Sequence, residues 1–275
     1  MISLLLPSRR RPKIFSRMVS SVRGTAKNPV EIVARFDDDD LESAKSAEQD
    51  GARVLIGPRI RNITAYWNEC FDACHGEIVA QWNDDVVLVD KGWDILVEKA
   101  FAEVPDKILV CHGDDIWGHR GNFGPHPFTS RRWVECLGVF IYPYYTSDFG
   151  DAGLNELADR LGRRRFVPFI VEHHHYSYKK CEPDENTLER LKRHEEDDPD
   201  STYYSSEKMQ ERINHAQKLA KLMDAEVDTK GWTPIREKSG VLSAGKCSKC
   251  GSLSTVFVQN EMIFCNGCAW SWNRK

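Results

Sequence analysis

The sequence lacks any apolar run approaching the roughly 18 residues that a membrane-spanning helix needs, and its mean hydropathy is −0.52. The apolar segment at residues 2–6 is too short for a signal peptide, and arginines follow it rather than precede it. A strong net charge is also absent, because 38 Lys and Arg against 42 Asp and Glu give −4. We therefore expect a soluble, cytoplasmic protein with no membrane partner, in which any nucleic-acid-binding surface is local.

Two further features that the sequence lacks limit the classes of protein to which it could belong. The chain has no internal repeat, and it has no glycine-rich phosphate loop followed by a lysine, which counts against a nucleotidyltransferase. Hydrophobic residues make up 41% and charged residues 29% of the chain, which is typical of a globular protein and excludes a wholly disordered one.

The pattern along residues 1–176 alternates short apolar runs with segments of helical periodicity. Strands are expected at residues 2–6, 30–36, 54–56, 78–82, 108–111 and 166–172, and helices at 13–23, 41–50, 62–75, 93–102 and 154–161. Repeated strand–helix units predict an α/β fold with a mostly parallel sheet and helices on both faces. Residues 112–135 are rich in glycine and proline, and so long an irregular loop is usually functional.

Charge and periodicity divide the chain into three parts. Residues 1–180 hold the strand–helix units, and 181–235 form a helical extension with helices expected near 185–196 and 206–225. Residues 236–275 carry six Lys and Arg against two Glu, a local charge of +4. This contrast predicts a separate C-terminal module.

Four of the nine cysteines form a metal-binding pattern in that module. Cys247 and Cys250 are separated by two residues, as are Cys265 and Cys268, with fourteen residues between the pairs. Four thiolates at this spacing predict a structural Zn²⁺ in a zinc ribbon. Redox-active pairs would instead need a thioredoxin-like setting, which is absent. Tryptophans beside basic residues in the ribbon suit base stacking, or they pack the ribbon against the larger domain.

Two adjacent carboxylates, Asp84 and Asp85, follow the apolar strand at 78–82. The carboxyl ends of parallel strands are where α/β sheets bind ligands, and carboxylate oxygens suit Mg²⁺ or Mn²⁺ bridging a diphosphate. Alone, the pair could equally form a simple turn.

The order of these motifs resembles the GT-A-fold glycosyltransferases, especially the family 2-like group. Residues 2–12 resemble its first strand and nucleotide loop, 30–40 its second strand ending in acids, and 62–85 its segment leading to the Asp-x-Asp motif. The motif stands here as Asn83-Asp84-Asp85, with asparagine in place of the first aspartate. The resemblance covers about residues 1–180, and the Rossmann-like GT-A fold is what it implies.

The resemblance also implies roles for individual residues. The nucleotide sugar, expected to be a UDP-sugar, would contact a set of donor-binding residues: Pro7, Ser8, Arg9, Asp38, Asp39, Asn62 and Asp84. Asp85 would hold the catalytic Mn²⁺ or Mg²⁺, with a further ligand from His173 or, second, His175. The general base would be Asp151 or, as second choice, Asp148. Asp151 could also serve only as a helix cap.

We therefore expect a metal-dependent glycosyltransferase, inverting if the acceptor hydroxyl attacks directly. The favoured acceptor is a hydroxymethylated pyrimidine in DNA, as in phage-type enzymes of this fold, which would place the protein in the host cytoplasm. The basic ribbon and Arg160, Arg163, Arg164 and Arg165 motivate this choice. A protein or surface saccharide is the alternative acceptor. A non-catalytic nucleic-acid-binding protein on a decayed transferase fold is the alternative class. The oligomeric state stays open.

Overall fold

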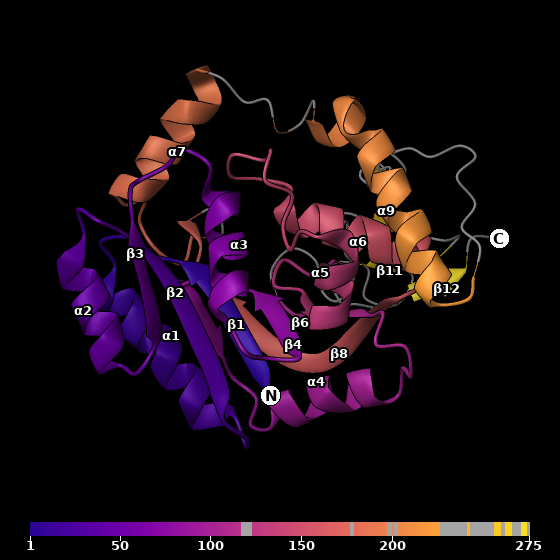
Figure 1. The fold of residues 1–275 in the computed structure, drawn as a ribbon, viewed down its shortest axis with the longest axis horizontal. Coiled ribbons are helices and arrows are strands. Elements are labelled where there is room, and N and C mark those ends of the chain that lie inside the picture. The colour runs from indigo at the N-terminus through magenta and orange to yellow at the C-terminus, as the bar shows by residue number, and fades with distance from the viewer. Residues whose placement is uncertain are drawn as a thin grey trace.

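The computed structural model describes residues 1–116, 123–176, 179–196, 200, 203–225, 241–242, 256–259, 262–265 and 271–273. Within these ranges no helix is long and apolar enough to cross a membrane. The chain begins in the strand–helix body and continues into the segments drawn in orange and yellow (Figure 1).

An eight-stranded sheet forms the centre of the main body, in the order β3-β2-β1-β4-β7-β6-β8-β5. Its strands are β1 (Ile2–Pro7), β2 (Val30–Asp37), β3 (Arg53–Gly57), β4 (Ile78–Gln81), β5 (Val86–Leu88), β6 (Val110–Asp114), β7 (Phe128–Ser130) and β8 (Arg164–His173). Strands β5 and β7 run antiparallel to their neighbours, and the other pairings are parallel. The expected α/β fold is confirmed, but the sheet is mixed: four of its seven strand pairings are parallel and three are antiparallel.

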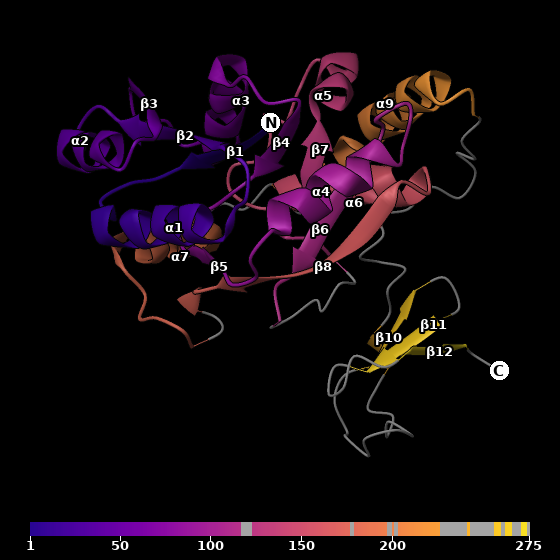
Figure 2. The same cartoon turned by 90° about the horizontal axis from the view of Figure 1, so that it is seen from below.

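Helices cover both faces of this sheet. They are α1 (Pro12–Thr25), α2 (Leu41–Gln49), α3 (Ile63–Ala73), α4 (Trp93–Ala102), α5 (Arg131–Leu137), α6 (Gly150–Arg160), α7 (Glu185–Glu196) and α9 (Met209–Leu222), with a π-helical turn η2 at Tyr203–Glu207. Figure 2 shows α1 and α3 on opposite sides of β1 and β2. Because side chains alternate along a strand, Leu4 and Leu6 join the apolar cluster that α1 completes, while Leu5 joins the cluster of α3.

The predicted irregular loop at 112–135 contains more structure than expected. Its second half forms β7 and the start of α5, and Ser130 caps that helix by accepting a hydrogen bond from the Trp133 backbone N–H at 3.1 Å. These elements are too short to show a hydrophobic periodicity, and for that reason the sequence pattern did not predict them. Residues 117–122 of the loop lie outside the described ranges.

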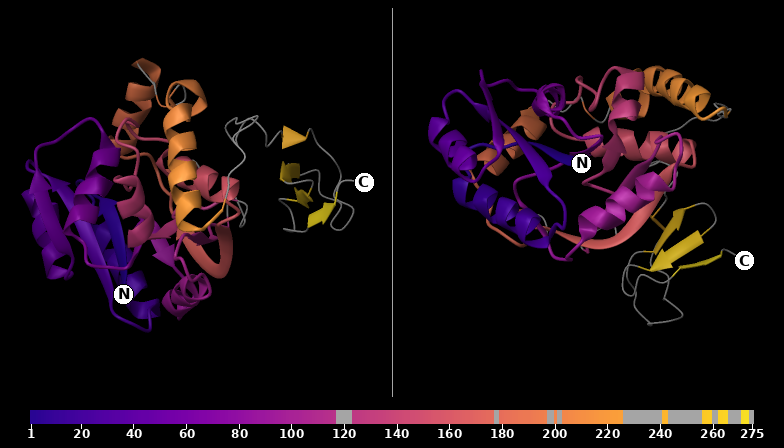
Figure 3. Two further views of the ribbon diagram at one scale, coloured as in Figure 1. Left: turned by 45° about the vertical axis from the view of Figure 1, so that its right-hand side comes forward. Right: turned by 60° about the horizontal axis from the view of Figure 1, so that its bottom comes forward.

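Helix α9, from the predicted helical extension, packs on α5 and α6 (Figures 1 and 3). Its Ala216 and Leu219 are fully buried and belong to the same apolar cluster as α3 and α6. Arg212 of α9 and Glu156 of α6 form an ion pair of 2.8 Å in which both side chains are 0% exposed. The extension therefore shares its core with the sheet body, although the predicted boundary at residue 180 stays a prediction.

Breaking that buried pair is expected to cost much more stability than breaking a surface pair. Glu156→Gln should lower the free energy of unfolding by about 3–5 kcal/mol, because it leaves the Arg212 charge buried and uncompensated. Urea unfolding followed by circular dichroism measures the loss. Glu103→Gln is the matched control, since the exposed Arg165–Glu103 pair at 2.7 Å should contribute less than about 1 kcal/mol. Equal losses in the two variants would contradict the expectation.

Near the C-terminus, four short strands form an antiparallel sheet, in the order β12-β11-β10-β9. They are β9 (Val241–Leu242), β10 (Val256–Gln259), β11 (Met262–Cys265) and β12 (Ser271–Asn273). Strands β10 and β11 pair with each other, and β11 ends at Cys265. Cys247, Cys250 and Cys268 lie outside the described residues, and only the backbone of Cys265 is described. The zinc site stays a prediction.

Candidate active site

A cavity of about 830 Å³ lies where the carboxyl ends of β1, β2 and β4 meet. Its walls come from the loop after β1, the turn after β4, residues 147–151 at the start of α6, the end of β8 and helix α7. The sequence-predicted residues that line it are Pro7, Ser8, Arg9, Asp84, Asp85, Asp148, Asp151, His173 and His175. Donor, metal and base candidates therefore meet in one cavity.

Three predicted donor residues are not among those lining the cavity: Asp38, Asp39 and Asn62. The Asp39 side chain is 49% exposed and forms ion pairs with Arg9 and Arg10. The Asn62 side chain connects two parts of the chain instead, because it accepts a hydrogen bond from the Thr64 hydroxyl at 2.6 Å and donates one to the Pro143 carbonyl.

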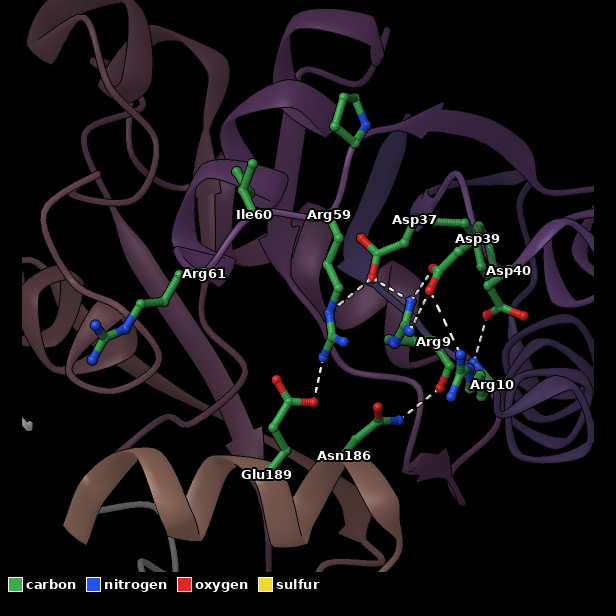
Figure 4. A network of polar contacts seen from close by, with 12 residues as sticks. Arg9, Arg10, Asp37, Asp39, Asp40, Arg59, Ile60, Arg61, Asn186 and Glu189 are labelled. Carbon is green, nitrogen blue, oxygen red and sulfur yellow. Dashed lines mark hydrogen bonds and ion pairs between the residues drawn. The ribbon is translucent and has the colours of Figure 1, made fainter. Parts of the chain in front are cut away.

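The acid that faces the cavity at the end of β2 is Asp37, which sequence reasoning missed (Figure 4). It is 2% exposed and accepts hydrogen bonds from the Tyr66 hydroxyl at 2.5 Å and from Arg9 at 2.7 Å. Arg59 lies 3.6 Å from the same carboxylate. Burial, followed by the hydrogen bond to Asp37, raises the pKa of Tyr66 to about 12. The Asp37 carboxylate therefore holds Tyr66, Arg9 and Arg59 together on this side of the cavity.

Asp84 ties the turn after β4 to the loop after β1. Its carboxylate accepts hydrogen bonds from the Ser8 hydroxyl at 2.7 Å and from Arg11 at 3.1 Å. Burial raises the pKa of Asp84, and the Arg11 charge opposes that rise. The link joins two predicted donor-binding segments that are 76 residues apart.

Asp85 points toward the histidines at the end of β8, since β5 pairs with β8 and brings Val86 opposite His173. One carboxylate oxygen of Asp85 lies 3.2 Å from His173 Nε2. Burial alone would raise the pKa of Asp85, but the adjacent His173 and the nearby Arg11 bring it below its ordinary value. The carboxylate is therefore ionised, as metal coordination requires.

The two predicted histidines are neighbours, with His173 and His175 ring centres 5.2 Å apart. Burial, followed by repulsion from His173, lowers the pKa of His175 to about 4, so its imidazole is neutral at pH 7. No group of three or more His, Cys, Asp or Glu side chains is arranged to hold a metal ion in the part of the chain that the structure describes. Asp85 and His173 nevertheless supply the oxygen and nitrogen donors that Mn²⁺ accepts, so a metal would draw its other ligands from substrate and water.

The two base candidates differ in their surroundings. Asp148 accepts a hydrogen bond from Arg190 of α7 at 2.6 Å. Asp151 lies in the first turn of α6, where one carboxylate oxygen accepts a hydrogen bond from the Ala152 backbone N–H at 2.7 Å. Both residues line the cavity, and Asp151 stays the first choice as the base, as predicted from the sequence.

Helix α7 lies across the arginines of the loop after β1, and this wall was not predicted (Figure 4). Asp184, just before α7, accepts two hydrogen bonds from Arg11, at 2.5 and 2.8 Å. Within the helix, Glu185 pairs with Arg10 at 2.9 Å and Glu189 pairs with Arg59. The sequence pattern predicted a helix near residues 185–196 but not the surface on which it docks.

No family model matches the chain, and no curated protein does. Among solved structures, S. aureus TarS, a family 2 glycosyltransferase of the GT-A fold, aligns with a TM-score of 0.49 and 12% sequence identity. The alignment covers 80% of this chain and 49% of that chain, so this chain spans about half the length of TarS.

Proposed function

We propose that the protein is a metal-dependent glycosyltransferase of the GT-A type that uses a nucleotide-sugar donor. The observation that carries the proposal is the meeting of three chemistries in one cavity: arginines, the Asp84–Asp85 pair, and an acid at the start of α6. Glycosyl transfer needs all three, because an anionic diphosphate leaves while an acceptor hydroxyl loses its proton.

The donor would lie over the ends of β1 and β4. Asp85 and His173 are the residues that would hold Mn²⁺ or Mg²⁺, which when bound neutralises charge on the leaving diphosphate. Arg11 lies beside both carboxylates of the motif and would contact the phosphates. Asp37 and Tyr66, on the neighbouring wall, offer hydrogen bonds to the nucleoside.

The acceptor would approach from the α6 end of the cavity. Its hydroxyl oxygen forms the new bond to the anomeric carbon as the bond from that carbon to the diphosphate oxygen breaks. The hydroxyl proton passes to Asp151, which is ionised before the reaction and neutral after it. A direct displacement of this kind inverts the configuration of the sugar.

For the acceptor we propose a hydroxymethylated pyrimidine in DNA. The basic residues of the C-terminal module support this choice. The four arginines that also suggested it are each ion-paired: Arg160 with Glu156, Arg163 with Asp106, Arg164 with Asp159 and Arg165 with Glu103. The DNA acceptor therefore depends on the module alone.

A thermal-shift screen of nucleotide sugars with Mn²⁺ tests the donor proposal, because a ligand that binds the folded state raises the melting temperature. We expect one nucleotide to stabilise the protein only when Mn²⁺ is present, and to be released during turnover. Failure of every nucleotide sugar to stabilise the protein or turn over would reject the transferase. Salt-independent binding to hydroxymethylated DNA, or no binding, would favour a saccharide acceptor instead.

Asp184 and the α7 residues Glu185 and Glu189 should compete with the donor's diphosphate for the arginines that these carboxylates contact. The triple variant Asp184→Asn, Glu185→Gln and Glu189→Gln is expected to bind UDP with Mn²⁺ about three- to tenfold more tightly, since partly exposed pairs are each worth at most about 1 kcal/mol. Isothermal titration calorimetry at low and high salt measures the change, and the gain should shrink at high salt. Glu182→Gln, an exposed site outside the helix, is the control. Unchanged or weaker binding in the triple variant would refute the competition.

A further inference from the structure

Asp200 is a fully buried carboxylate that the proposed mechanism does not use. It is 0% exposed and lies between α7 and α9 in the sequence. It accepts hydrogen bonds from three successive backbone N–H groups, those of Thr146 at 2.7 Å and of Ser147 and Asp148 at 2.9 Å each. The Thr146 hydroxyl adds a fourth at 3.1 Å. Converging N–H donors of this kind satisfy a buried carboxylate.

The turn that Asp200 holds leads directly into the acceptor end of the cavity. Ser147, Asp148, Phe149, Gly150 and Asp151 all line the cavity without interruption. The turn is fastened from the other side as well, because the Thr146 carbonyl accepts a hydrogen bond from the Ile63 backbone N–H at 2.9 Å. The position of Asp151 therefore depends on the geometry of residues 146–148.

Backbone strain lies at the junction between that turn and α6. Phe149 has a φ of 63°, in the left-handed region that glycine favours. Such a conformation persists only where the surroundings enforce it, and it is enriched at functional sites. The four hydrogen bonds to Asp200, immediately before Phe149, are contacts that enforce it.

We propose that Asp200 is a positioning residue for the acceptor step, a role that rests on the glycosyltransferase function proposed above. Its carboxylate fixes residues 146–148, and through them the direction in which α6 presents Asp151. These four hydrogen bonds go to Thr146, Ser147 and Asp148, which are not among the donor-end residues Arg9, Asp84 and Asp85. Loss of the carboxylate should therefore affect proton transfer to Asp151 and leave the donor's binding site intact.

Asp200→Asn in the full chain tests this assignment, because it keeps the side chain's size and turns one acceptor atom into a donor facing N–H groups. We expect kcat for sugar transfer to fall at least about 100-fold, as a displacement of about 1 Å at a reacting group can cost this much. The dissociation constant for UDP with Mn²⁺ should stay within about twofold of the parent. Thr146→Val, which removes only the hydroxyl hydrogen bond, should lower kcat by a smaller factor and gives a second variant if the first does not fold.

The matched control is Asp94→Asn. Asp94 is also 0% exposed and accepts backbone N–H hydrogen bonds, from Lys27 at 3.0 Å and Asn28 at 2.7 Å, but does not line the cavity. A general loss of stability, which Asp94→Asn is designed to reproduce, should lower kcat and UDP affinity together. If Asp200→Asn lost both in this way, Asp200 would be purely structural. Parent-like kcat in Asp200→Asn would equally overturn the assignment. A parent protein that neither binds UDP with Mn²⁺ nor turns over a nucleotide sugar would instead reject the underlying function.

Discussion

Replacing Asp85 with alanine should lower kcat/KM for nucleotide-sugar turnover by about 10³-fold, because a metal at a leaving group stabilises the transition state by several kcal/mol. Asp85 is the carboxylate beside His173, at 3.2 Å, in the turn between β4 and β5. Release of the nucleoside diphosphate, followed across a Mn²⁺ titration, gives the measurement. The residual activity of the variant should no longer respond to Mn²⁺.

The control for this loss is Asp90→Asn, five residues farther along the chain. Asp90 accepts a hydrogen bond from the Ile170 backbone N–H at 2.7 Å and does not line the cavity. It should keep the parent's metal dependence even if it unfolds at a lower temperature. Turnover by Asp85→Ala at the parent's rate, with the parent's response to Mn²⁺, would remove the basis of the proposed donor site.

Asp151→Asn should reduce kcat by about 10²- to 10⁴-fold, the usual contribution of a general base. UDP binding should be unaffected, because Asp151 lies at the α6 end of the cavity. The asparagine oxygen can still accept the hydrogen bond from the Ala152 N–H, and the charge lost near the helix N-terminus is worth about 0.3–1 kcal/mol. Steady-state kinetics alongside thermal unfolding separates the loss of the base from loss of the fold.

Asp148→Asn tells the two base candidates apart. It removes the negative charge from the 2.6 Å ion pair with Arg190 and should weaken the contact between α7 and the turn, with a smaller decrease in kcat than Asp151→Asn. If Asp148→Asn proved the more damaging of the two variants, the assignment of the base would have to be reversed.

Much of the fold could be predicted because its central strands β1 and β4 are buried on both faces. Such a strand must be largely apolar, and the apolar run of β1 stands out against the polar loop that follows it. Elements β7 and α5 escaped because they are three and seven residues long. The Ser130 cap and Gly138, at a φ of 75° after the helix, were the available signals for α5.

The cavity residues that follow directly from a strand in the sequence could be predicted. Those that depend on the docking of elements distant in the sequence were missed. Asp84 and Asp85 follow a strand, so the sheet alone brings them to its edge. Asp37, by contrast, differs from Asp38 and Asp39 only because it is the last residue of β2 and is buried among side chains from other elements. The arrangement of α7 on the arginines depends on long-range contacts, which periodicity and spacing do not encode.

The docking of α7 and Asp200 has a practical consequence for dissecting the protein. Both come after residue 180, where the strand–helix alternation has ended, yet both build the cavity or fix its lining. A shortened protein ending there would retain every strand of the large sheet. It would lose Asp184, which pairs with Arg11, and Asp200, which accepts hydrogen bonds from three backbone N–H groups. Inactivity of such a fragment would therefore say nothing about whether the sheet can bind a sugar nucleotide.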